Sequence, residues 1–361
     1  MFKFLAIFPF IVSATFAADV AVRDTEALTR ALREAKPGTV IRLAPGRYAG
    51  GQSVAGISGT VGSPIVLAGA PGGASIIEGG ASGIHLSGCS FWQLHDVAFT
   101  GAQSNGVNID DAGKPDRPVR GIVLRGLDIR NIGPRGNRDG IKLSGADAFT
   151  ITGCKIAHWG DGGSGIDMVG CHDGVVEKST FTHGETAVMA NGVQTKGGSR
   201  SVTIRECKFI NAGGRAVNIG GSTGADYFRS LAATYEARDI TVEGCHFTGS
   251  MAPIAFVGVD GATVRQNTIV NPGRWVIRIL QENQNPALAP CRNGVFADNH
   301  ITFQSTLTTA VNIGGGTDAK SFRFERNTWH CQDAPAETRR RVVLPVEENG
   351  GTYDASPPKV R

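Results

Sequence analysis

The sequence predicts an all-β protein folded as a single-stranded parallel β-helix, and two repeated patterns carry this prediction. A unit close to Gly-Val-X-Ile recurs between residues 83 and 313. Between these units, apolar and polar residues alternate as they do in strands. The alternating segments end 22 to 38 residues apart, at Phe99, Ile129, Ile156, Phe181, Phe209, Phe247, Ile269, Ile301 and Trp329. A loose repeat of short strands is typical of a solenoid, here of roughly nine to eleven turns.

A short amphipathic helix is predicted for residues 24–35, before the first repeat. Pro37 and Gly38 end this helix. We expect this helix to cap the coil, because an open solenoid end exposes strand edges and core. Residues 39–43 are predicted to form the first strand. No linker interrupts the repeat, so we expect one domain from 18 to 332, followed by a C-terminal tail, 333–361.

Residues 1–17 have the pattern of a secretory signal, with one lysine, an apolar run and small residues before Ala18. The apolar run is shorter than the roughly 20 residues that a membrane span needs. We therefore expect a secreted or periplasmic protein that is not anchored in a membrane.

The charge balance is mildly positive, with 36 Lys and Arg against 32 Asp and Glu. A net charge of +4 without long basic runs does not indicate a nucleic-acid partner. It is compatible with an acidic polymer as the partner.

Seven cysteines in an exported chain raise the question of disulfides. Three of them stand two residues before the apolar residue that ends a repeat, the place that asparagines take in later repeats: Cys154, Cys207 and Cys245, then Asn267, Asn299 and Asn327. We expect these six side chains to stack inside the coil, with the thiols buried and unbridged. Cys291 and Cys331 lie outside that column and are predicted to form a disulfide.

The X residues of the repeated unit point outward, because side chains alternate faces along a strand. In successive turns, about 4.8 Å apart, they form a column: His85, Asn108, Lys142, Asp167, Gln194, Asn218, Phe256, Arg278 and Asn312. The next outward column is Ser87, Asp110, Ser144, Val169, Lys196, Gly220 and Gly258, and the preceding corner holds Asn105, Asp139, Ser164, Asn191 and Arg215. We call these three columns the outward strip. Its amides, acids and bases suit the hydroxyls and carboxylates of an acidic polysaccharide.

A lysine on this strip could act as a base in the elimination of a uronate polymer. The base removes the proton beside the substrate carboxylate, which a cation or hydrogen-bond donor must neutralise. Lys142 has Asp167 one turn above it, a partner that keeps a lysine charged. Lys196 has Val169 and Gly220 as its column neighbours and no stacked acid. The pattern therefore favours Lys196 as the base.

The excursion from Ser222 to Asp239 is the longest between repeats and carries Tyr227, Phe228 and Arg229. Long loops on a compact solenoid are often functional. We expect it to form one wall of a groove, with Tyr227 contacting substrate. The alternative is a flap that only covers an apolar part of the coil.

Residues 35–48, 62–67 and 84–99 together resemble the alginate lyase and chondroitinase B family of right-handed parallel β-helices, and the similarity of pattern covers most of the chain. The resemblance implies a right-handed coil. It also implies that Lys196, in Gln194-Thr-Lys196-Gly-Gly-Ser, is the catalytic base. The family's catalytic arginine would fall at or beside Asn218, where only Arg215 is near. The family's calcium-binding acids are absent, so we expect no metal cofactor.

Three functions stay open at this point. The first is a metal-free polysaccharide lyase, a class that includes C5-epimerase chemistry. It would use Lys196 and Arg215 as catalytic residues. The second is a glycoside hydrolase that uses Asp139 and Asp167, with Asp161 nearby. The third is a carbohydrate-binding protein without catalysis. The expected substrate contacts are Lys142, Asp167, Asn191, Gln194, Asn218, Arg278 and Tyr227.

Overall fold

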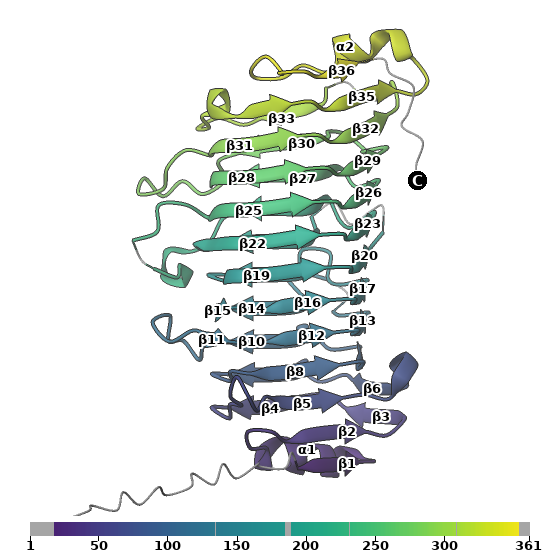
Figure 1. The fold of residues 1–361 in the computed structure, drawn as a ribbon, viewed down its shortest axis with the longest axis vertical. Helices are drawn as coiled ribbons and strands as arrows, with labels where there is room; N and C mark the ends of the chain where they lie inside the picture. Colours follow the sequence, from purple (N-terminus) through teal and green to yellow (C-terminus); the bar gives the residue numbers. More distant parts are fainter. Residues whose placement is uncertain (1–17, 134, 185–188, 231, 308, 354–361) are drawn as a thin grey trace, which may run out of the picture.

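The computed structural model describes residues 18–133, 135–184, 189–230, 232–307 and 309–353. In these residues the chain winds into one coil of three long sheets (Figure 1). Each strand pairs in parallel with the equivalent strand of the next turn, as Asn105 does with Asp139. The predicted parallel β-helix is therefore confirmed. The predicted signal segment 1–17 and the last residues of the tail, 354–361, lie outside the described residues.

The three sheets follow one another in every turn of the coil. Sheet A contains β1 (Asp19–Val22), β2 (Val40–Leu43), β5 (Ile65–Ala68), β8 (Trp92–His95), β11 (Val119–Arg120), β12 (Val123–Arg125), β15 (Ala146–Asp147), β16 (Thr150–Thr152), β19 (His172–Glu177), β22 (Ser199–Arg205), β25 (Ala237–Glu243), β28 (Val259–Arg265), β31 (Arg292–Ala297) and β34 (Arg323–Glu325). Sheet B contains β3 (Gly46–Ala49), β6 (Ser75–Glu78), β9 (Ala98–Thr100), β13 (Asp128–Arg130), β17 (Lys155–Ala157), β20 (Thr180–Thr182), β23 (Lys208–Ile210), β26 (His246–Thr248), β29 (Thr268–Val270), β32 (His300–Phe303), β35 (Thr328–Cys331) and β36 (Thr352–Tyr353).

Sheet C carries the outward strip. It contains β4 (Gln52–Ala55), β7 (Ser82–Ser87), β10 (Asn105–Asp110), β14 (Asp139–Ser144), β18 (Ser164–Val169), β21 (Asn191–Lys196), β24 (Arg215–Gly220), β27 (Ala252–Val257), β30 (Ile277–Leu280) and β33 (Val311–Ile313). Its ten strands, counted in the described part of the chain, agree with the expected nine to eleven turns.

The helices are short and lie outside the sheets. They are α1 (Thr25–Glu34), α2 (Thr338–Arg341) and the 3-10 turns η1 (Pro71–Gly73), η2 (Ala225–Tyr227), η3 (Ala319–Ser321) and η4 (Pro335–Glu337). None of the helices in the described ranges is long and apolar enough to cross a membrane.

Helix α1 caps the N-terminal end of the coil, as predicted (Figure 1). Asp24 precedes its first residue and accepts a hydrogen bond from the Ala27 amide at 2.8 Å. The helix buries Leu28, Ala31 and Leu32. The expectation that the first strand begins at residue 39 is wrong, because β1 precedes the helix and pairs in parallel with β2.

The core is built from like side chains stacked turn upon turn. The rings of Phe181, Phe209 and Phe247 lie 4.8 Å apart and almost parallel. That spacing is the distance between neighbouring strands, so the repeat in sequence becomes a repeat in packing.

The predicted column of cysteines and asparagines is confirmed. Cys154, Cys207 and Cys245 are buried and unbridged. Above them, the Asn267 side-chain amide donates to Asn299 Oδ1 at 3.0 Å, and the Asn299 amide donates to the next asparagine, Asn327, at 2.9 Å. The buried asparagines thus satisfy one another along the coil axis.

The ladder ends on Glu348 of the predicted tail, whose Oε1 accepts from Asn327 Nδ2 at 2.7 Å. Strand β36 of the same tail pairs with β35. The described part of the tail therefore closes the C-terminal end of the coil.

The predicted disulfide between Cys291 and Cys331 is wrong, because all seven cysteines are free and buried. Cys291 immediately precedes β31 of sheet A, whereas Cys331 ends β35 of sheet B. The two thiols therefore belong to different sheets.

The outward strip has the predicted register from His85 to Asn218. In β27 the prediction is wrong by one residue. Ala255, not Phe256, pairs with Asn218 and Arg278, and Phe256 is fully buried. Likewise Val257, not Gly258, continues the second column after Gly220. The segment is apolar at almost every position, so alternation could not determine which residues face inward.

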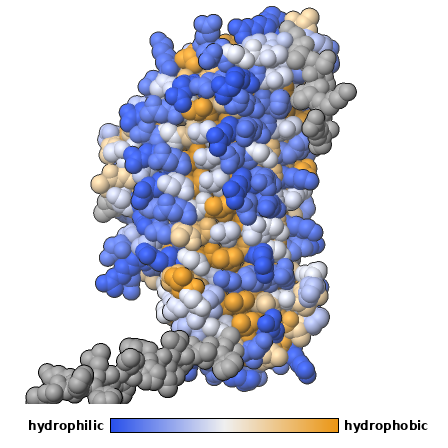
Figure 2. Space-filling model, in the orientation of Figure 1, coloured by the Kyte–Doolittle hydropathy of each residue, from blue (hydrophilic) through white to orange (hydrophobic). Residues whose placement is uncertain are grey.

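Three excursions leave the coil between sheet C and sheet A: residues 111–118, 221–236 and 281–291. They project from the same edge of the coil, at the left in Figure 1. Figure 2 shows that hydrophilic side chains cover most of this view of the molecule, with hydrophobic ones between them. The shared edge brings the three loops beside the end of the outward strip.

Candidate functional site

A groove of about 550 Å³ opens between two of these loops. Its floor lies on sheet C and its walls come from loops 221–236 and 111–118. The floor residues are Lys142, Ser144, Val169 and Lys196, and the wall residues include Asp111, Gly113, Pro115, Thr223, Tyr227, Phe228 and Arg229. We call this cavity the lysine groove.

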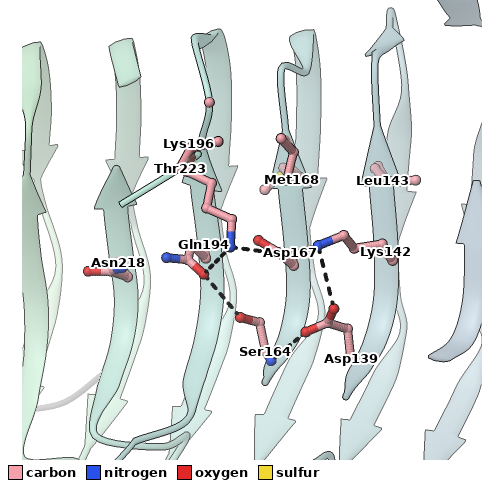
Figure 3. Close-up of polar contacts among 12 residues, drawn as sticks. Asp139, Lys142, Leu143, Ser164, Asp167, Met168, Gln194, Lys196, Asn218 and Thr223 are labelled. Carbon is pink, nitrogen blue, oxygen red and sulfur yellow. Dashed lines mark hydrogen bonds and ion pairs between the residues drawn. The ribbon is translucent and has the colours of Figure 1, made fainter. Parts of the chain in front are cut away.

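Two lysines converge on one carboxylate beneath the groove (Figure 3). Lys196 Nζ lies 3.2 Å from Asp167 Oδ2, and Lys142 Nζ bonds to the same oxygen. Asp167 has no exposed surface. The prediction that Lys196 lies away from any acid is therefore wrong. Its column neighbour is Val169, as expected, but its side chain crosses to the neighbouring column.

Asp139 adds a second carboxyl group to the lysine pair. It is 2% exposed, accepts from the Ser164 amide at 2.8 Å, and lies 3.7 Å from Lys142 Nζ. Burial and the negative charge of Asp167 raise the pKa of Asp139 to about 7. Burial alone would lower the pKa of Lys142, but Asp167 and Asp139 raise it overall. Asp139 can therefore be neutral near pH 7.

Gln194 holds Lys196 in place. Its Oε1 accepts from Lys196 Nζ at 3.2 Å, and its Nε2 donates to the Gly220 carbonyl at 3.4 Å. Gln194 is buried, as Asp167 is. Both residues belong to the site, but they support the lysines from below instead of lining the groove.

The loop 221–236 is anchored firmly enough to act as a wall. Buried Glu236 accepts hydrogen bonds from the Gly197 amide, from the amide and hydroxyl of Thr223, and from Asn283 at 2.6–2.9 Å. Arg229 forms a bidentate ion pair with Asp147, with distances of 2.5 and 2.9 Å between the guanidinium nitrogens and the carboxylate oxygens. The loop thus lines the groove, as expected.

Tyr227 is the most exposed aromatic side chain of the wall. It is 74% exposed and lines the groove. The contact between Tyr227 and a ligand stays a prediction.

The remaining predicted site residues do not line the groove. Arg215 is paired with Glu282 at 2.5 Å and donates to Asn218 Oδ1 at 3.2 Å. Asn191 begins β21 at the opposite end from Lys196. Arg278 lies three turns further along the strip than Gln194.

Sequence reasoning missed Glu236, Asp147 and Glu282, which fix the loops by long-range contacts. For Glu236 and Glu282 the only signal was an acidic residue at one end of a long excursion, and for Asp147 there was none. The described ranges contain no group of three or more His, Cys, Asp or Glu side chains placed to hold a metal ion. The metal-free site stays a prediction.

Comparison with known proteins places the fold. The family model described as right handed beta helix region matches residues 82–269. An alginate lyase from Paenibacillus sp. str. FPU-7 superposes with a TM-score of 0.59 at 19% identity, over 84% of this chain and 99% of that one. Pectate lyase Pel9A gives 0.55 at 14% identity, over 81% and 73%.

A further structure of the same fold is the GH136 lacto-N-biosidase from Eubacterium ramulus, with a TM-score of 0.50 at 12% identity, over 86% of this chain and 67% of that one. No curated protein matches the sequence. At these identities the likeness concerns the fold alone.

Proposed function

The chain belongs to the right-handed β-helix family, and from that premise we propose that it binds an acidic polysaccharide in the lysine groove and cleaves it by β-elimination at Lys196. One observation carries the proposal. Two lysines meet on a single buried carboxylate at the floor of an open groove.

Charge favours an anionic sugar in this groove. When Asp139 is protonated, the two ammonium groups face only the carboxylate of Asp167, which leaves an excess positive charge. A uronate carboxylate can complete that pairing with charge-assisted hydrogen bonds. Exposed Tyr227 offers a ring face on which a sugar can stack.

The elimination uses the groove's own residues. Lys196 first releases its own ammonium proton to solvent, and its amine then removes the proton from the carbon beside the uronate carboxylate. The freed electron pair forms a double bond as the glycosidic oxygen departs, and the proton on Lys196 is then available to that oxygen. Lys142 holds the same oxygen of Asp167, so the carboxylate keeps a cation when Lys196 has given up its proton.

The hydrolase alternative fits the geometry less well. Hydrolysis needs two carboxyl groups that flank the scissile bond. Asp139 and Asp167 are 2% and 0% exposed and lie beneath Lys142. Asp161, the third acid considered, is exposed but lies outside the groove lining.

Incubation with alginate, pectate and glycosaminoglycans, with and without a chelator, tests the proposal. We expect new ultraviolet absorbance from an unsaturated uronate, unaffected by chelator. Lys196→Ala should lower this rate roughly 10²- to 10⁴-fold, the usual contribution of a general base. The matched control is Lys155→Ala, an exposed lysine on sheet B, which should leave the rate unchanged.

A Lys196→Ala variant as active as the wild type would overturn the assignment of the base. Reducing ends formed without ultraviolet absorbance would identify a hydrolase. Retardation in polysaccharide-containing gels without any product would identify a carbohydrate-binding protein and refute the elimination.

A further inference from the structure

A second cationic cluster lies on the outward strip, separate from the lysine groove. The strip runs from Gln194 through Asn218 and Ala255 to Arg278, so Arg278 lies three turns beyond Gln194. At about 4.8 Å per turn, this is about 14 Å. Arg278 is therefore too far away to act with Lys196 on one sugar.

Arg274 and Arg278 are gathered around a single indole ring. The guanidinium carbons of Arg274 and Arg278 lie 4.2 Å and 4.6 Å from the centre of the Trp275 ring. Arg278 Nε also donates to Asn312 Oδ1 at 2.9 Å. The indole and the amide together fix the direction of two flexible side chains, which reduces the entropy that ligand binding would cost.

The positive charges of this cluster are only partly balanced by acid, because the charge of Glu282 acts on Arg278 from beyond ion-pair distance. In the described part of the chain, neither Arg274 nor Arg278 has a carboxylate within ion-pair distance, and Glu282 is paired with Arg215. Burial lowers the pKa of Arg278, and the positive charge of Arg215 lowers it further. Like charges held close together repel each other, so the arrangement is stabilised when an anion binds between them.

We propose that Arg274, Trp275 and Arg278 form a distal subsite for an anionic group of the polysaccharide, either a carboxylate or a sulfate ester. The arginines contact the anion, and Trp275 positions them. The subsite rests on the proposed function only for the identity of the polymer. Since a sugar unit is close in length to one turn of the coil, a chain of about four units reaches from Lys196 to this cluster.

Affinity electrophoresis of the full-length protein tests the subsite without requiring turnover. The gels contain alginate for carboxylates, dextran sulfate for sulfate esters, or dextran as a neutral polymer. We expect Arg278→Ala to weaken binding about tenfold to alginate or to dextran sulfate, whichever carries the group that the subsite binds, because charge-assisted hydrogen bonds are lost. Arg200→Ala, which removes an exposed arginine from sheet A, is the matched control and should bind as the wild type does.

Two further variants separate positioning from folding. Trp275→Ala should weaken binding in the same way, and Trp275→Phe should restore part of it because an aromatic face remains under the guanidinium groups. Arg278→Lys keeps the charge but loses the fork and should lie between the wild type and Arg278→Ala. Thermal unfolding of every variant should match the wild type, which makes the binding losses specific.

The outcomes of the subsite and of the elimination differ. Equal binding by Arg278→Ala and Arg200→Ala overturns the subsite alone. If Arg278→Ala binds more weakly and the wild type releases no unsaturated product, the subsite is supported and the lyase is refuted. No retardation of the wild type in any anionic gel overturns both. With defined uronate oligosaccharides, the loss should appear only for chains of about four units or longer.

Discussion

Among the residues of the site, Asp139 is the one whose pKa changes most clearly when the protein folds. Its pKa rises from 3.8 to about 7 because it is buried beside the negative charge of Asp167. Between these two pKa values the folded protein holds a proton that the unfolded chain releases. The stability contributed by this group is therefore greatest at low pH and is lost as the pH rises through about 7. Above that pH the native state must keep Asp139 as a buried carboxylate.

Asp139→Asn should therefore stabilise the protein at alkaline pH. Asparagine keeps an oxygen that can accept from the Ser164 amide and removes the buried charge, while Lys142 retains Asp167. We expect a higher melting temperature than the wild type at pH 8.5, by about 2–4 °C for each kcal/mol gained. The gain should shrink at pH 5, where Asp139 is neutral in the folded wild type.

Thermal unfolding at the two pH values measures this difference. Exposed Asp116, changed to Asn, serves as the control and should show no such dependence. A gain of the same size at both pH values would show that the buried charge is not its cause.

At the same scale, the position of Lys196 on the outward strip could be predicted, but its partner could not. Column reasoning considers neighbours straight along the coil axis, which for Lys196 are Val169 and Gly220. A lysine side chain is long enough to reach the adjacent column, where it meets Asp167. Contacts of that kind depend on rotamers, which the repeat does not encode.

Among the elements, the loop 221–236 decides whether the strip has a groove. Glu236, at its end, accepts four hydrogen bonds and connects the loop to Gly197 and to Asn283 of the next excursion. Gly197 adjoins Lys196, so one buried carboxylate fixes both the wall and the end of the floor.

Glu236→Gln should detach the wall and leave the coil intact. An amide has one acceptor oxygen in place of two, so up to two of the buried donors lose their partner, at about 1–3 kcal/mol each. We expect faster proteolysis within residues 221–236 and weaker binding of the polysaccharide, with unchanged far-ultraviolet circular dichroism. Glu243→Gln is the control, because Glu243 forms only a surface ion pair with Arg265. Equal protease resistance in the two variants would contradict this role for Glu236.

The strands could be predicted where alternation is clear, as in β7, β10 and β14. β27 could not be placed, because its residues are apolar on both faces and alternation gives no register. The excursions could be located but not shaped, since the ion pair between Arg229 and Asp147 joins residues 82 positions apart. No local sequence pattern predicts an ion pair between residues so far apart in the chain.

For the whole molecule, the fold could be predicted because each turn makes the same contacts with its neighbours. One repeat, read many times, fixes the sheets, the core stacks and the column of cysteines and asparagines. The ends break the repeat, and there the sequence was less informative. β1 was missed, and the position of Cys291 and Cys331 on two different sheets could not be deduced from their distance along the chain.

The asparagine ladder tests whether the coil behaves as a row of coupled turns. Asn299 accepts from Asn267 and donates to Asn327 and to the Val264 carbonyl, all within the coil. Asn299→Ala leaves these buried groups without partners and should cost roughly 2–4 kcal/mol. Because each turn contacts only its neighbours, the loss should concentrate in the C-terminal turns. Hydrogen exchange should accelerate in β28, β31 and β34, while β8 and β12 stay protected.

Cys207→Ala, in the same column, removes only weak thiol contacts and should cost less. Acceleration spread evenly along the coil would show that it unfolds as one unit instead.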